Sequence, residues 1–114
     1  TVKARIGLSK NGQIKQAFAT GDTIELEVSL EEEYQDGDLL WVCLPDSLSR
    51  VTGGGQVKLF SMDFKGKSKL SIPLAATGRT GNNGKEPQKF AVCVRNMFNE
   101  DRVGSPGLME VRVE

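Results

Sequence analysis

The sequence predicts an all-β fold, an antiparallel β-sandwich of seven to eight short strands. Apolar residues recur at every second position, which is the period of a strand and not of a helix. The apolar runs are separated by Gly, Asn, Asp and Lys at regular intervals, and helix signals are scarce. The length of 114 residues fits one domain, residues 1–114, that can bury a sizeable core.

The clearest strand pattern lies at residues 23–30. Ile24, Leu26, Val28 and Leu30 alternate with polar residues there, so a strand places all four on one face. The segment 38–44 is apolar on both faces, as in a central strand. Further strands are predicted at 2–9, 13–18 (Ile14 and Phe18 on one face), 57–64, 68–77, 88–96 and 108–114.

Turn residues divide these segments. Asn11-Gly12 predicts a type I′ hairpin, because that turn needs a positive φ at both central residues. Pro73 lies inside a strand pattern, which predicts a sheet edge or a local bulge. Single helical turns are expected at 45–51 and at 95–101.

The composition excludes several classes of function. Fifteen basic and fifteen acidic side chains cancel, so a general nucleic-acid binder is not expected. The chain has no His, which excludes Ser-His-Asp and Cys-His catalysis and His-containing metal sites. No apolar run is long enough for a membrane helix, so we expect no membrane insertion. An enzyme and a cofactor are therefore not expected.

The stretch "TGRTGNNGKEPQ" at 77–88 resembles a phosphate-binding loop at first sight. Its glycine spacing from Gly78 to Gly84 is one residue too long, and Glu86 replaces the hydroxyl that would ligate magnesium. A strand pattern follows in place of the helix that such a loop requires. We interpret the stretch as a turn.

Cys43 and Cys93 lie on two predicted neighbouring strands. One interpretation is a pair of buried free thiols that pack as small hydrophobic groups. The alternative is a disulfide across the two strands. Redox catalysis is the weakest alternative, because no nearby residue lowers the pKa of a thiol.

Two loops are candidates for binding. The acidic segment 30–38 could hold calcium, although its spacing does not match a known calcium loop and a solvated loop is the simpler interpretation. In the segment 95–107, which ends in a Gly-Ser-Pro-Gly turn, Met97, Phe98 and Arg102 are candidate partner-binding residues. If Met97 and Phe98 are buried, they cap the core instead, and this is the interpretation we favour.

Trp41 falls on the third main strand, where immunoglobulin-like domains place their core tryptophan, so the chain resembles an Ig-like sandwich. It departs from antibody domains, because the second main strand has no Cys and Ala91 replaces the expected Tyr. It looks more like the modules of bacterial surface and secreted proteins. The "ATGDTIELEV" segment at 19–28 is similar to macroglobulin-type modules, although the thioester signature of that family is absent.

These observations predict a non-catalytic module of a larger protein, which acts in protein–protein contact or as a structural spacer. The alternative is a calcium- or carbohydrate-binding module. An extracellular or periplasmic location is slightly favoured over a cytoplasmic one. The mildly basic loop 77–88 and the acidic loop 30–38 are expected at opposite ends of the domain, an arrangement suited to head-to-tail contact between modules.

Overall fold

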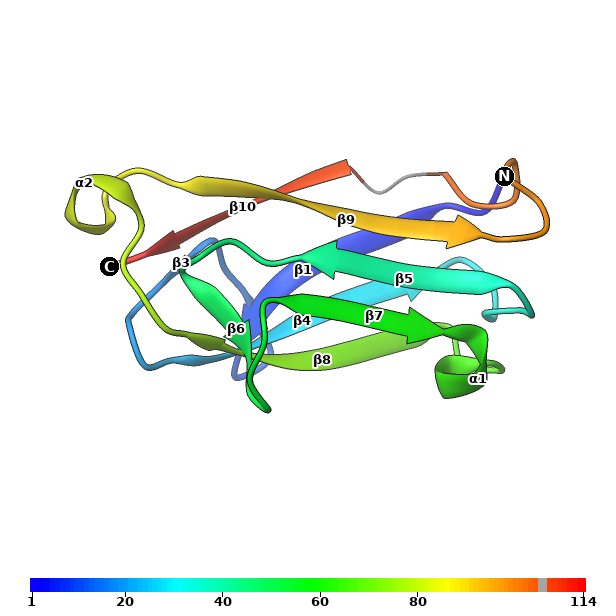
Figure 1. The fold of residues 1–114 in the computed structure, drawn as a ribbon, viewed down its shortest axis with the longest axis horizontal. Helices are drawn as coiled ribbons and strands as arrows, with labels where there is room; N and C mark the ends of the chain where they lie inside the picture. The colour runs from blue at the N-terminus through cyan, green and yellow to red at the C-terminus, as the bar shows by residue number, and fades with distance from the viewer. Residues whose placement is uncertain (105–106) are drawn as a thin grey trace.

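The computed structural model, which describes residues 1–104 and 107–114, consists of two five-stranded sheets that share one core (Figure 1). The first sheet has the order β2 (Gln13–Ile14), β1 (Ala4–Lys10), β4 (Thr23–Leu30), β8 (Lys69–Ala76) and β6 (Leu48–Arg50). The second has the order β3 (Ala17–Phe18), β10 (Gly107–Val113), β9 (Gln88–Asn96), β5 (Asp38–Cys43) and β7 (Gln56–Phe60). The all-β sandwich predicted from the sequence is confirmed at this level.

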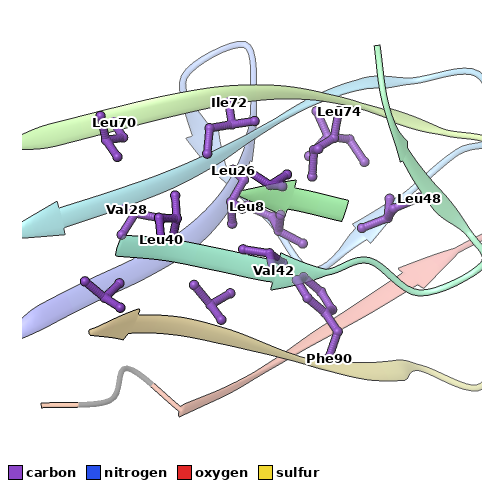
Figure 2. Packing of buried hydrophobic residues seen from close by; sticks show 14 of the residues in the cluster. Leu8, Leu26, Val28, Leu40, Val42, Leu48, Leu70, Ile72, Leu74 and Phe90 are labelled. Carbon is purple, nitrogen blue, oxygen red and sulfur yellow. The ribbon is translucent and has the colours of Figure 1, made fainter. Parts of the chain in front are cut away.

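The core is built from alternate residues of the long strands. Ile24, Leu26 and Val28 of β4 are fully buried, as their spacing predicts. Leu40 and Val42 of β5 are also fully buried and belong to the same apolar cluster (Figure 2). Each sheet therefore contributes one apolar face, which is the arrangement that a sandwich needs to exclude water.

The N-terminal strand pattern divides between the two sheets. Asn11 and Gly12 have φ values of 52° and 80°, which confirms the type I′ hairpin between β1 and β2. The chain then crosses to the second sheet, where β3 pairs in parallel with β10. Ile14 is consequently 64% exposed while Phe18 is buried, so the prediction that they share a face is wrong. The parallel pair also makes the second sheet mixed and not wholly antiparallel.

The segment 57–64 is a strand followed by a helical turn, and not the continuous strand predicted. β7 ends at Phe60, whose N–H donates to the Asp63 carboxylate at 3.1 Å, and α1 (Ser61–Phe64) begins there. This turn exposes Met62 and buries Phe64, whose ring packs edge-on against Tyr34 with 4.4 Å between centroids.

The helical turns predicted at 45–51 and 95–101 are both wrong. Residues 48–50 form β6, and residues 95 and 96 end β9. The second helix, α2 (Gly81–Gly84), instead lies in the glycine-rich loop. The Gly-Ser-Pro-Gly turn predicted at 104–107 includes positions 105 and 106, which lie outside the described residues.

Pro73 lies where its lack of an N–H costs little. β8 pairs with β4 along its whole length, but β6 pairs only with residues 74–76 of β8. Pro73 is therefore just beyond the end of β6, on a side of β8 that has become an edge. The prediction that this strand lies at a sheet edge is wrong, because β8 lies between β4 and β6, but Pro73 itself occupies a part of β8 that β6 does not pair with.

The two charged loops lie at opposite ends of the molecule, as predicted. The loop with α2 occupies one end of the 43 Å long axis, and the loop between β4 and β5 occupies the other (Figure 1). Among the described residues, none of the helices has the length and apolar character needed to span a membrane.

Candidate functional site: the outer face of the second sheet

Trp41 lies on the outer face of the second sheet, where 44% of its surface is exposed. The expectation of an Ig-like core tryptophan is wrong for a simple reason. Leu40 and Val42 occupy the core, and adjacent side chains of a strand point to opposite faces. One apolar face of β5 is thus buried in the core, and the other is an exposed apolar surface.

The strand register arranges six side chains of this outer face in two rows. Leu39 lies between Phe60 of β7 and Arg95 of β9. Trp41 lies between Lys58 of β7 and Cys93 of β9. We call this set the Trp41 face, and it consists of Leu39, Trp41, Lys58, Phe60, Cys93 and Arg95.

A groove of about 440 Å³ runs over the Trp41 face. Leu39, Trp41 and Cys93 form its floor, and Met97 and Glu100 line the end where β9 passes into the following loop. Met97 is 63% exposed. The groove therefore joins apolar side chains of the sheet to one of the residues that the sequence singled out for partner binding.

The Trp41 face carries two cations, Lys58 and Arg95, that have no acidic partner among the described residues. Lys58 lies 5.5 Å from the centroid of the Phe60 ring, within the range of a cation–π contact. Neither Lys58 nor Arg95 forms an ion pair with any of the residues described. Their charges are thus free to interact with a bound molecule.

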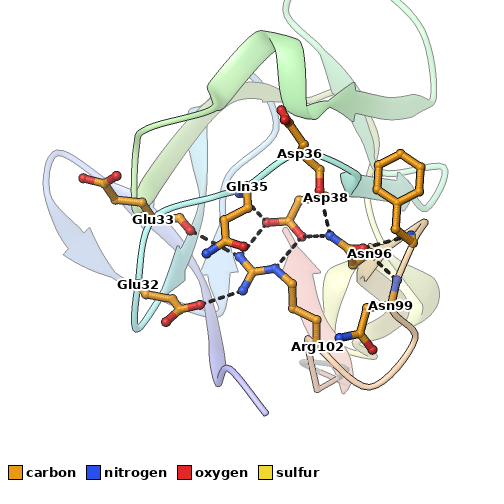
Figure 3. A network of polar contacts seen from close by, with 9 residues as sticks. Glu32, Glu33, Gln35, Asp36, Asp38, Asn96, Asn99 and Arg102 are labelled. Atoms are coloured by element: carbon orange, nitrogen blue, oxygen red, sulfur yellow. Dashed lines mark hydrogen bonds and ion pairs between the residues drawn. The ribbon is translucent and has the colours of Figure 1, made fainter.

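The loop beyond β9 is fixed by an ion pair at the end of the second sheet where β5 begins (Figure 3). Arg102 donates from Nε to Oδ1 of Asp38 at 3.0 Å and from Nη2 to Oδ2 at 2.9 Å. Its other nitrogen, Nη1, donates to Glu32 at 2.6 Å. The Asp38 side chain is fully buried and that of Arg102 is 10% exposed, so Arg102 positions the loop and is not itself available to a partner.

Asn96 completes this network from the end of β9. Its side-chain amide donates to Oδ1 of Asp38 at 2.8 Å, and its oxygen accepts the N–H groups of Phe98 and Asn99, both at 2.9 Å. Because these bonds fix the loop from within, Met97 and Phe98 point outward, at 63% and 80% exposure. The interpretation that they cap the core is wrong.

The network also sets the charge states of its members. Burial opposes ionisation of Asp38, but hydrogen bonds from Arg102, the Gln35 N–H and Asn96 outweigh it and hold the pKa of Asp38 below its ordinary value. The hydrogen bond to Asp38 raises the pKa of Arg102, against the opposing effect of burial. Both groups are therefore charged throughout the physiological range.

The acidic loop is engaged by basic residues and does not converge on a cation site. Asp38 is bound to Arg102, and Asp36 lies 3.0 Å from Lys65. Within residues 1–104 and 107–114, no three His, Cys, Asp or Glu side chains are grouped as a metal would need. Tyr34 of the same loop is buried, which raises the pKa of its hydroxyl to about 12.

The two cysteines are free thiols on the same outer face, and no disulfide joins them. Cys93 lies directly opposite Trp41, and Cys43 lies two residues further along β5, so the cysteines are diagonal neighbours. Diagonal Cα atoms are about 7–8 Å apart, beyond the usual reach of a disulfide. Cys43 is exposed and Cys93 is partly buried, so neither is the core residue that we expected.

The glycine-rich loop forms a tight turn against the C-terminal strand. Asn82, Asn83 and Gly84 all have positive φ values. The N–H groups of Gly84, Lys85 and Glu86 donate to carbonyls within the loop, so they are not directed at a ligand. The interpretation of residues 77–88 as a turn is supported by this geometry.

The chain matches no protein-family model, and no curated protein sequence matches it.

Sequence reasoning found Met97 but missed the Trp41 face. The signal was present in the apolar outer positions Leu39, Trp41 and Cys43, which alternate with core residues in "DLLWVCL". This pattern does not distinguish two kinds of strand. A strand that is buried on both faces has the same sequence as a strand with one buried face and one exposed apolar face.

Proposed function

We propose that this chain is a non-catalytic interaction module that binds a partner protein on the Trp41 face and the adjoining Met97. The observation that carries the proposal is the exposure of Trp41 and Met97 along one groove, with Phe60 exposed beside it on the same face. Large exposed apolar side chains that lie together are costly in water unless they are covered. Aromatic residues in such positions are typical of binding hot spots.

The rigidity of the groove wall supports the same proposal. Asp38, Asn96 and Arg102 fix the loop that presents Met97 and Phe98. A loop that is already ordered loses little conformational entropy when a partner binds, so its apolar contacts contribute more fully to affinity.

We also propose that the sandwich is Ig-like. The order β1-β4-β8 in one sheet and β10-β9-β5-β7 in the other corresponds to strands A-B-E and G-F-C-C′ of that fold. β6 lies beside β8, where strand D would lie, but it precedes β7 in the chain. A module of a bacterial surface or secreted protein, with distant macroglobulin-type likeness, is consistent with this order.

A carbohydrate ligand is the second candidate. One indole ring lies in a groove that is also lined by Lys58 and Arg95, a combination of aromatic platform and polar groups that suits a sugar. Titration with oligosaccharides, followed by the fluorescence of the single tryptophan, tests this candidate. Saturable quenching at submillimolar sugar would favour it over a protein partner.

Thiol reactivity tests the proposed function, because Cys93 lies in the groove and Cys43 lies beside it. The rates of alkylation of both thiols are measured in the isolated chain and in the cells that naturally produce it. We expect both rates to fall in the cells, since a bound partner covers the face. A cysteine placed at Ile14, exposed on the other sheet, is the matched control and should react equally in both settings. Equal rates for Cys43 and Cys93 in both settings would show an uncovered face and refute the proposal.

A further inference from the structure

We infer that the Trp41 face binds a protein segment in which a short apolar stretch is flanked by two acidic residues. This inference rests on the proposed function and names the chemistry of the partner.

The two cations of the face are placed diagonally. Lys58 adjoins Trp41 in one row, and Arg95 adjoins Leu39 in the other. Two strand spacings of about 4.8 Å and a shift of two residues, about 6.8 Å, separate their Cα atoms by roughly 12 Å. An extended segment covers that distance in three to four residues. Two acidic side chains that far apart can therefore reach both cations at once.

The space between the cations is apolar. Leu39 and Trp41 lie at its centre, and Met97 lines the end of the groove near Arg95. A ligand that bridges Lys58 and Arg95 must cross this surface. Apolar side chains between its acidic groups would bury Trp41 and Leu39, whereas the hydroxyls of a saccharide chain would lose water there without gaining hydrogen bonds. The face therefore favours a peptide over an acidic polysaccharide.

A second copy of the chain is a poor occupant for the same reason. A two-fold contact through the Trp41 face would bring two Lys58 and two Arg95 side chains together. The only acidic side chain that lines the groove among the described residues is Glu100. Like charges that face each other across an interface oppose association, so the face selects a partner of opposite charge.

Selection from a random twelve-residue peptide library displayed on phage tests the inference. The wild-type chain is the bait, and a variant with Lys58→Glu and Arg95→Glu is the counter-bait. Arg5→Glu is the control, because Arg5 is exposed on the outer face of the first sheet and its replacement makes one such charge reversal away from the groove. Thermal unfolding of each variant establishes that it is folded.

We expect the enriched peptides to carry two Asp or Glu residues separated by two or three mainly apolar residues. Their affinity should fall on the order of tenfold or more in the doubly reversed variant and stay unchanged in Arg5→Glu.

Enriched peptides without the acidic pair, or with equal affinity for the counter-bait, would overturn the inference. So would polygalacturonate that binds more tightly than the selected peptides. Absence of enrichment combined with protection of Cys93 in cells would also overturn it, while leaving the proposed function standing.

Discussion

The guanidinium of Arg102 forms two hydrogen bonds to the carboxylate of Asp38, at 3.0 and 2.9 Å, across 64 residues of sequence. The pair joins the start of β5 to the loop after β9 (Figure 3), and Asn96, which donates to Asp38, also accepts the N–H of the exposed Phe98. An ion pair at the end of the sheet thus fixes the loop whose residues Met97 and Glu100 line one end of the groove.

Removal of Arg102 should destabilise the protein strongly. Arg102→Ala leaves the fully buried Asp38 without its counter-ion, so we expect a loss of about 3 kcal/mol in the free energy of unfolding. Lys65→Ala is the matched control, because its ion pair with Asp36 is exposed on both sides and should contribute at most about 0.5 kcal/mol. Urea denaturation measures both values. Equal losses for the two variants would contradict the role given to the buried pair.

Acid should remove the contribution of Asp38. Since the pKa of Asp38 is lowered in the folded protein, its ionisation stabilises the fold above the ordinary carboxyl value of about 3.9, and this stabilisation is lost as the pH falls through the folded value. The gap in unfolding free energy between the wild type and Asp38→Asn should therefore be wide at pH 7 and narrow below about pH 4. Denaturation curves at pH 7, 4 and 2.5 test this sign. A gap that widens in acid would show that the carboxylate is not stabilised in the fold.

Gly84 should tolerate no side chain. Its φ is 85°, and an added Cβ would lie 2.5 Å from Cα of Glu114 and 2.7 Å from the carbonyl oxygen of Val113. Gly53 has a similar φ of 91° but open space around it. We expect Gly53→Ala to cost about 1 kcal/mol from backbone strain alone, and Gly84→Ala to cost at least about twice as much. The melting temperatures of the two variants distinguish backbone strain, which both share, from the steric clash at Gly84. Equal melting temperatures would contradict the close contact between Gly84 and the C-terminal residues.

Trp41 should matter little for stability. It is half exposed on the outer face, so Trp41→Ala should cost no more than about 1.5 kcal/mol, whereas Leu40→Ala, one residue away in the core, should cost about 3 kcal/mol. Chemical denaturation of both variants provides the comparison. A larger loss of unfolding free energy for Trp41→Ala than for Leu40→Ala would show that Trp41 is buried in the core, as in an Ig domain.

Both cysteines should react with alkylating agents as free thiols. Cys43 is exposed and Cys93 is partly buried, so alkylation of the native protein should be fast at Cys43 and slower at Cys93. Peptide mass spectrometry assigns the two rates. Denaturation should make them equal, and a mass that rises by two hydrogens on reduction would instead reveal a disulfide.

The head-to-tail contact between modules stays a prediction. Its geometric condition is met, because the loop with α2 and the acidic loop lie at opposite ends of the long axis (Figure 1). Arg102 and Lys65 neutralise part of the acidic end, however, so the charge contrast is smaller than the sequence of the acidic loop alone implies.

Local sequence patterns were enough to predict the all-β class, the burial of Ile24, Leu26 and Val28, and the hairpin at Asn11-Gly12. These features follow from local rules, since period two and positive φ preferences act over a few residues. The outward orientation of Trp41 depends on how the sheets assemble, because a strand with two apolar faces has the same sequence pattern whether one or both faces are covered.

The pairing of the charged residues also depends on the tertiary structure. Nothing near Arg102 in the sequence marks Asp38 as its partner, and the pairing exists because β5 and β9 are neighbours in one sheet. The same neighbourhood placed Lys58, Trp41 and Arg95 on one surface. Long-range strand order, which depends on how the whole chain buries its apolar area, determines which side chains can act together.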